Sequence, residues 1–250
     1  MRKYYLIAAA LTFVAGLILL APAATLYGWI APRLGGQVAL AGVTGTVHEG
    51  DAAAVMVGGS PLLQDLHWHL SIGELLLGRL GVDLDSRGAV TLSGHVSRGF
   101  GALRASNLLV SSGLKPLLAV AGQAYAPIDG QASLDLKHLK LLGNWPSDAD
   151  GTLRVQNLAW TLARDPLVLG DYQADIQRDG NDIVALVHTL GGPLDVNGDA
   201  RAKSDHSYEL HLQLRAKPDA PPLIVNLLHS LGQPDPQGYY HLRQQGKLQP

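Results

Sequence analysis

The sequence predicts a mainly β protein, with an N-terminal transmembrane helix followed by two tandem antiparallel β units that have one short helix each. Three observations carry this prediction: an uncharged apolar stretch near the N-terminus, short runs that alternate apolar and polar residues, and a segment that recurs later in the chain. Of the 250 residues, 47% are hydrophobic and 16% are charged. Such a chain can bury a substantial core and is not expected to be disordered.

The composition excludes several classes of site and partner. The chain has no cysteine, so it forms no disulfide, no thiolate zinc site and no cysteine nucleophile. The formal net charge is −2, and Arg2, Lys3 and Arg33 all precede the first acidic residue, Glu49. The remainder of the chain is therefore more acidic still, and no nucleic-acid partner is expected.

Residues 1–33 are predicted to form a short cytoplasmic start and a transmembrane anchor. Residues 4–32 carry no charge, and about 20 apolar residues are enough to cross the hydrocarbon core of a bilayer. Arg2 and Lys3 precede this run and favour an N-terminus in the cytoplasm. We therefore expect a single crossing of the cell inner membrane, with the bulk of the chain in the periplasm.

A cleaved signal peptide is the alternative interpretation of the same stretch. Small residues at positions 21–23 follow the apolar run and resemble a cleavage site. Apolar and aromatic residues continue from Leu26 to Ile30, which favours an uncleaved anchor. Both interpretations deliver the rest of the chain to the same side of the membrane.

From Val38 onward, alternation with a period of two predicts antiparallel strands. Leu210, Leu212 and Leu214, for example, alternate with polar or charged residues. Strands with one solvated face are typical of antiparallel sheets rather than parallel ones. Residues 114–121 and 222–231 lack this alternation and are predicted to be short helices.

An internal repeat predicts that two similar units follow one another. Residues 63–78 align without a gap on residues 155–170, and seven of the sixteen positions are identical. The predicted units are residues 38–142 and 151–248, joined by a polar turn. Each copy places a tryptophan, Trp68 or Trp160, on the same strand face as leucines two residues away, so both are expected to be core residues.

No catalytic, cofactor or metal site is predicted. His67 and His69 share one strand face at a spacing that can serve zinc or copper, but the second copy lacks both, so solvated histidines are the expected interpretation. Asp148 and Asp150 lack the spacing of a calcium loop and are assigned to the linking turn. The common nucleophile, phosphate-loop, zinc-protease and dinucleotide patterns do not occur. The chain is not expected to be an enzyme, and its binding residues are left unassigned.

Several motifs resemble those of the type II secretion system protein N family, also called general secretion pathway protein N. Residues 45–50 stand where the family has G-T-x-W-x-G, with His48 in place of the aromatic residue. Further matches lie at residues 66–68, 170–172, 192–198 and 231–248. The resemblance implies a single-pass inner-membrane accessory component of the machine that moves folded proteins from the periplasm to the exterior. The partners that it implies are other subunits of the inner-membrane platform, or the secretin, and it implies no cofactor.

A second resemblance leads to another class of function. Tandem amphipathic β units behind an N-terminal anchor are also the plan of AsmA-like envelope proteins, whose curved sheets offer an apolar trough to lipid. A lipid carrier needs an open, continuous apolar groove, whereas a scaffold needs a closed core and an external binding patch. Alternation in the sequence does not distinguish an open sheet from a closed one.

The predicted membrane topology is tested by fusing alkaline phosphatase after Pro250. The fusion should be active, because the positive residues that precede the apolar run keep the N-terminus in the cytoplasm and a single crossing then exports the other end. Phosphatase assays on intact cells measure this. An inactive phosphatase, together with an active cytoplasmic reporter at the same position, would contradict the topology.

Overall fold

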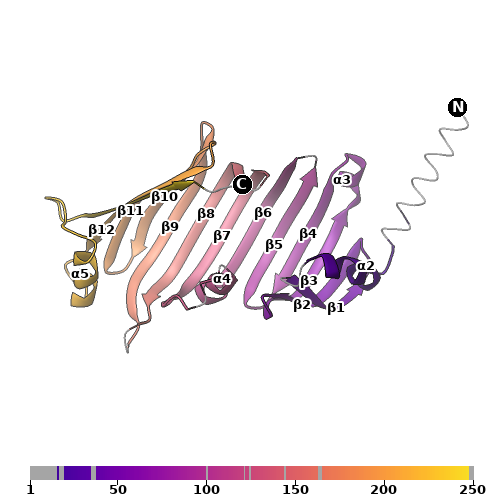
Figure 1. The fold of residues 1–250 in the computed structure, drawn as a ribbon, viewed down its shortest axis with the longest axis horizontal. Helices are drawn as coiled ribbons and strands as arrows, with labels where there is room; N and C mark the ends of the chain where they lie inside the picture. The colour runs from indigo at the N-terminus through magenta and orange to yellow at the C-terminus, as the bar shows by residue number, and fades with distance from the viewer. Residues whose placement is uncertain are drawn as a thin grey trace, which may run out of the picture. The chain divides into compact units, whose positions relative to one another are not determined.

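The computed structural model describes residues 16, 20–34, 38–99, 101–120, 122–123, 125–143, 145–162 and 165–247. Within these residues the chain forms thirteen antiparallel strands, and their order in the sheet follows the sequence from β1 to β13 (Figure 1). The chain divides into two compact units, Met1–Ser97 and Arg98–Pro250. The predicted mainly β class is confirmed.

The first unit contains the strands β1 to β5, the last of which ends just beyond the boundary. Its elements are α2 (Ala23–Ile30), the 3-10 helix η1 (Ala31–Leu34), β1 (Val38–Gly45), β2 (Glu49–Val57), β3 (Ser60–Ser71), α3 (Ile72–Leu76), β4 (Leu80–Arg87) and β5 (Val90–Gly99). Helix α3 is only five residues long. It continues directly from a strand, so the alternation pattern did not reveal it.

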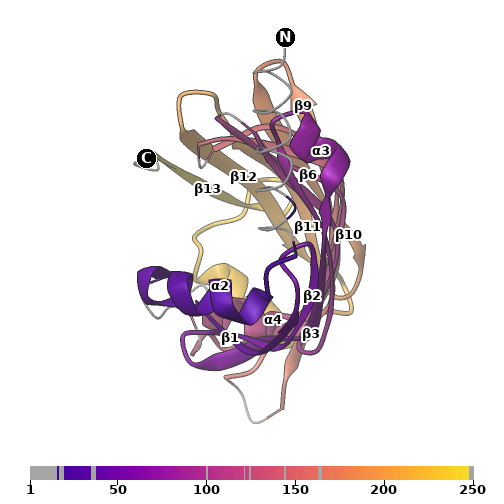
Figure 2. The same ribbon diagram turned by 90° about the vertical axis from the view of Figure 1, so that its right-hand side faces the viewer.

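The second unit contains the strands β6 to β13. Its elements are β6 (Ala102–Gly113), α4 (Leu114–Val120), β7 (Ile128–Leu142), β8 (Trp145–Trp160), β9 (Leu167–Asp179), β10 (Asp182–Gly191), β11 (Leu194–Ala202), β12 (Ser207–Ala216), α5 (Pro222–His229) and β13 (Tyr240–Lys247). Helices α4 and α5 confirm the two helices predicted at residues 114–121 and 222–231. Both lie on the same side of the sheet (Figure 2).

The predicted membrane crossing lies mostly outside the described residues. Residues 1–15 and 17–19, which hold most of its apolar run, are not among them. In the part of the chain that the structure describes, no helix is both long enough and apolar enough to cross a membrane. The single-pass topology therefore stays a prediction.

Helix α2, which follows that run, is fastened to the first unit. The Leu40 backbone N–H donates a hydrogen bond of 2.8 Å to the Tyr27 hydroxyl. The Val47 N–H donates one of 3.1 Å to the Ala21 carbonyl, and Ala23 is buried. Residues in the C-terminal part of the predicted anchor, residues 1–33, thus belong to the fold of this unit.

The two copies of the sequence repeat share an unusual backbone feature. Asp65 in β3 and Asn157 in β8 are equivalent in the alignment, and both have a positive φ, of 48° and 51°. The strand pairing shifts register around each of them. Asn107 in β6 has the same conformation, with φ at 50°. Aspartate and asparagine enter this region more readily than most residues. The shared bulge fits the predicted duplication, which stays a prediction together with its unit boundaries.

Two local expectations about the repeat are not met. Asp148 and Asp150, assigned to a linking turn, lie in β8 opposite Lys140 and His138 of β7. The strand begins earlier than predicted because its pairing with β7 already starts at Trp145, opposite Leu142.

The two tryptophans of the repeat are only partly buried. Trp68 donates from its indole N–H to the Val47 carbonyl at 3.3 Å, and Trp160 is partly exposed as well. The most deeply buried large apolar side chain is instead Ile224 of α5, at 1% exposure. Alternation identified the strand face of each tryptophan, but not how far that face is covered.

In the first unit, a histidine between two carboxylates joins α3 to the strands. The Nδ1 atom of His95 lies 2.8 Å from Oδ1 of Asp83, and its Nε2 atom lies 3.2 Å from Oε1 of Glu74. Burial lowers the pKa of His95, but the hydrogen bonds to Asp83 and Glu74 outweigh this effect and raise the pKa above its ordinary value of 6.5. The protonated ring therefore links α3 with β4 and β5.

This histidine predicts a pH-dependent contribution to folding. Because its pKa is raised in the folded state, the contribution is complete below the ordinary value of 6.5 and is lost as the pH rises through the folded-state pKa. Titration of His95 by NMR should give a pKa above the ordinary value, and Asp83→Asn should lower it. Asp85→Asn, the same change two residues further along β4, is the control and should leave it unchanged. A wild-type pKa at or below the ordinary value would refute the linkage.

Candidate functional site

One face of the sheet in the second unit is apolar from β7 to β12. A first row of directly paired residues crosses these six strands through Leu136, Gly151, Ile176, Ala185, Ala200 and Leu210. The adjacent row runs through Leu134, Leu153, Ala174, Val187, Gly198 and Leu212. Neither row contains a polar side chain, because the period-two alternation turns every polar neighbour to the opposite face.

The opposite face of these strands is polar, and its charges pair with one another. The pairs include Lys137 with Asp150, Arg201 with Asp179, and Arg215 with Asp195. Such exposed pairs add little stability, but they leave the sheet with one wet face and one dry face.

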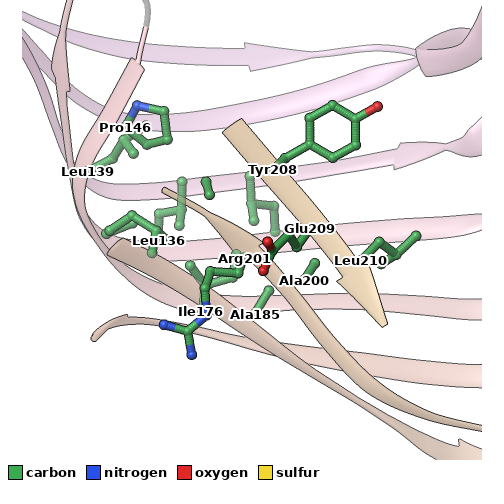
Figure 3. A pocket seen from close by; sticks show the side chains of 14 residues that line it. Leu136, Leu139, Pro146, Ile176, Ala185, Ala200, Arg201, Tyr208, Glu209 and Leu210 are labelled. Atoms are coloured by element: carbon green, nitrogen blue, oxygen red, sulfur yellow. The ribbon is translucent and has the colours of Figure 1, made fainter. Parts of the chain in front are cut away.

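The apolar face is hollowed at two places. The first hollow has a volume of about 470 Å³ and lies over the first row of paired residues (Figure 3). Its other lining residues are Leu134, Leu139, Pro146, Ala149, Ile183, Arg201, Ala202, Tyr208 and Glu209. The small side chains of Ala149, Ala185, Ala200 and Ala202 in its lining leave this space.

The second hollow lies further along the same strands, beneath the two helices. Its volume is about 490 Å³, and its lining residues are Leu114, Leu118, Ile128, Val155, Leu158, Leu169, Tyr172, Leu194, Val196 and Leu214. On β8, β9, β11 and β12, the residues of the second row lie between the two hollows. On β9, for example, Ala174 is two residues from Ile176 of the first hollow and two from Tyr172 of the second, and all three share one strand face. We call the two hollows and this row together the apolar trough.

Helices α4 and α5 partly cover the end of the trough that holds the second hollow. Leu114 and Leu118 of α4 line that hollow. Ile224 and Leu228 of α5 are buried in a cluster with Tyr172 and other residues of the sheet. The helices therefore wall one end, while the rows of apolar residues continue beyond them.

The ring of Tyr172 lines the trough, and its hydroxyl is hydrogen-bonded to the backbone. The hydroxyl donates to the carbonyl oxygens of Leu169, at 2.9 Å, and Leu194, at 3.1 Å. Burial, together with the neighbouring carboxylates of Asp171 and Asp195, raises the pKa of Tyr172. The neutral, hydrogen-bonded hydroxyl is therefore not offered to a ligand.

The two charged residues at the first hollow are also engaged elsewhere. The Arg201 guanidinium lies 3.0 Å from Asp179 and 3.6 Å from Asp182, and Figure 3 shows it pointing away from the apolar side chains. Glu209 pairs with Lys203. Apart from the Tyr208 hydroxyl, the hollow is left with hydrocarbon walls, which suit an apolar ligand.

The histidines considered from the sequence lie in the first unit, apart from the trough-forming strands. His67 lies 2.7 Å from Asp51 and 3.8 Å from Glu49, and the ring of His69 lies 4.6 Å from that of His48. Among the described residues, no group of three or more histidines and carboxylates has the arrangement of a metal site. The sequence left open whether the sheet has a closed core or an open apolar groove, and the small residues at inward positions, such as Ala185 and Ala200, were the available signal for the groove.

The role of Tyr172 predicts the effect of removing its hydroxyl. Tyr172→Phe should lower the free energy of unfolding by about 1–3 kcal/mol, because two backbone carbonyls lose a buried donor. Tyr208→Phe is the matched control in the same trough, since its hydroxyl makes no hydrogen bond within the described residues, and it should change stability by less than about 0.5 kcal/mol. Urea denaturation measures both. Equal effects of the two variants would show that the Tyr172 hydroxyl does not stabilise the fold.

Comparison with known proteins gives the family. Residues 36–243 match the family model described as type II secretion system (T2SS), protein N. The chain is also 28% identical over 224 residues to type II secretion system protein N of Vibrio cholerae serotype O1 (strain ATCC 39315 / El Tor Inaba N16961), and the match covers 84% of each chain. No solved structure matches. Because the family model covers most of the chain, including strands of both compact units, the chain belongs to the type II secretion system protein N family.

Proposed function

We propose that this protein serves type II secretion as a non-catalytic scaffold of the inner-membrane platform, anchored by its N-terminal segment and with both β units in the periplasm. The observation that carries the proposal is the family match over residues 36–243. Membership of the family supports an accessory role in type II secretion. The uncharged run at residues 4–32 supports the membrane anchor.

The polar face of the second unit offers a contact surface for another secretion subunit. Leu186 and Leu190 of β10 are 45% and 52% exposed. Leu186 stands between Asp175 and Asp199 on the neighbouring strands. Exposed aliphatic side chains within a polar surround are typical of protein interfaces. We assign contact with a platform subunit, or with the secretin, to this part of β10.

Deletion of the gene tests the role in secretion. Release of folded exoproteins should fall, because the platform would lack one of its accessory components, while the lipid asymmetry of the outer membrane should be unchanged. Assays of secreted enzyme and of detergent sensitivity measure the two. The single variants Leu186→Lys and Leu190→Lys should weaken co-purification of platform subunits, whereas Leu142→Lys, an equally exposed leucine at the end of β7, should not.

An AsmA-like envelope protein that transfers lipid is the second candidate. The apolar trough favours it, since the sheet is open on that face where a scaffold would be expected to have a closed core. The deletion distinguishes the two functions. Normal secretion combined with detergent sensitivity would contradict the scaffold and favour lipid transfer.

A further inference from the structure

The apolar trough has hydrocarbon walls, is open beyond α4 and α5, and has no part in the contact surface on the opposite face. We propose that it holds an acyl chain of a membrane phospholipid. This inference goes beyond the role in secretion, but it rests on the membrane anchor proposed above for its supply of lipid. Four features of the trough lead to it.

The first feature is that the trough offers little hydrogen bonding. The Tyr172 hydroxyl is bound to backbone carbonyls, and the Thr189 hydroxyl is bound to the backbone of Val196. The Tyr208 hydroxyl at the first hollow is left without a hydrogen bond within the described residues. An extended peptide lying against these walls would find few partners for its own N–H and C=O groups. The occupant must therefore present an apolar surface to the trough.

The second feature is the size of the hollows. A helix with side chains is about 10 Å wide and rises 1.5 Å per residue, so it fills roughly 120 Å³ per residue. Hollows of about 470 and 490 Å³ would each hold only a few helical residues. The volumes fall in the range of about 300–1,000 Å³ that is usual for small-molecule sites. A slender hydrocarbon chain fits within this space, whereas an amphipathic helix would place only its apolar side chains in the hollows.

The third feature is the continuity of the two hollows. Gly198 and Ala174 in the row between them have little or no side chain, and they sit among Leu153, Val187 and Leu212. A chain that lies along β9 or β11 can therefore pass from one hollow to the other over a low apolar floor. A long flexible acyl chain uses both hollows at once, whereas a compact ligand uses one.

The fourth feature is the bare outer side of α5. Ile224 and Leu228 face the core, while Leu223 and Leu227 of α5 are 47% and 39% exposed, and Leu231, just after the helix, is 50% exposed. The segment 221–232 contains no acidic residue, lysine or arginine, and its exposed polar side chains include Asn226 and His229. A helix with exposed leucines beside uncharged polar residues is suited to the interface of a bilayer. The helix that walls the trough would thus bring this end of it to the lipid surface.

Photolabelling of the full chain in vesicles tests the proposal. The vesicles contain phosphatidylethanolamine, phosphatidylglycerol and a small fraction of phosphatidylcholine with a diazirine in one acyl chain, and mass spectrometry maps the labelled residues. Label should appear at Leu136, Ile176 and Leu210. Their neighbours on the opposite face, such as Asp135 and Asp175, should stay unlabelled. A chain that floats with the vesicles but carries label only within residues 4–32 would overturn the proposal.

A variant with a filled trough is compared with the wild type in the same labelling experiment. Ala185→Leu combined with Ala200→Leu adds bulk to two residues that face each other in the floor of the first hollow. Labelling of Leu136 and Leu210 should fall at least about fivefold, because the added leucine side chains occupy the space that the acyl chain needs. Ala53→Leu, on the exposed side of β2, adds the same bulk elsewhere and should leave labelling unchanged. Labelling of the wild type decides the outcome if the filled variant does not fold.

The remaining outcomes separate this proposal from the proposed function. If the chain does not float with the vesicles, the proposed anchor is wrong. A fatty acid that carries a diazirine, added in solution, then tests the trough without the anchor. Absence of label in the trough from this fatty acid would overturn the inference. Label from the fatty acid but not from the phospholipid would contradict the proposed source of the chain. Cross-links between two copies through Leu136 or Leu210 would assign the trough to a dimer. Trough labelling together with normal secretion in the deletion strain would contradict the scaffold only.

Discussion

The structure of the second unit depends on its sheet having one polar and one apolar face. An antiparallel sheet tolerates water on one face, but its apolar face has to be covered. Here the charged side chains of the polar face pair with one another across strands, as Lys137 does with Asp150. The apolar face is covered only in part, where Ile224 and Leu228 of α5 pack against Tyr172. Because the apolar face is only partly covered, the hollows remain open beside the helices, and the proposed ligand would lie in them.

Close approach of neighbouring strands fixes two glycines in the apolar rows. A Cβ atom on Gly198, whose φ is +154°, would lie 2.0 Å from the His211 carbonyl oxygen, and one on Gly151 would lie 2.2 Å from the Asp135 carbonyl oxygen. Only glycine fits where neighbouring strands approach so closely. The rows therefore carry no side chain at these two positions, while alanines such as Ala185 and Ala200 form the floor of the first hollow.

Much of this architecture could be predicted from residues near one another in sequence, and the rest could not. Alternation such as that of Leu210 to Leu214 identifies a strand and its dry face, and the prolines before Ile224 identify the start of a helix. Alternation does not say what covers the dry face, so the choice between an open trough and a closed core was left undecided, and the partial exposure of Trp68 was missed. The left-handed residue Asn107, which matches those in the repeat, was missed as well, because a backbone conformation leaves little trace in composition.

The first unit bears on whether the membrane segment is retained. The small residues that resemble a cleavage site are engaged in its fold: the Ala21 carbonyl accepts a hydrogen bond from Val47, and Pro22 forms a β-bridge with Thr46. A peptidase acts on extended, accessible chain, and removal of this segment would strip these bonds from β1 and its neighbours. A chain cleaved after Ala23 would lack these contacts, and the uncleaved anchor stays a prediction. The predicted anchor would hold the chain at the bilayer, which both the scaffold role and an acyl chain in the trough require.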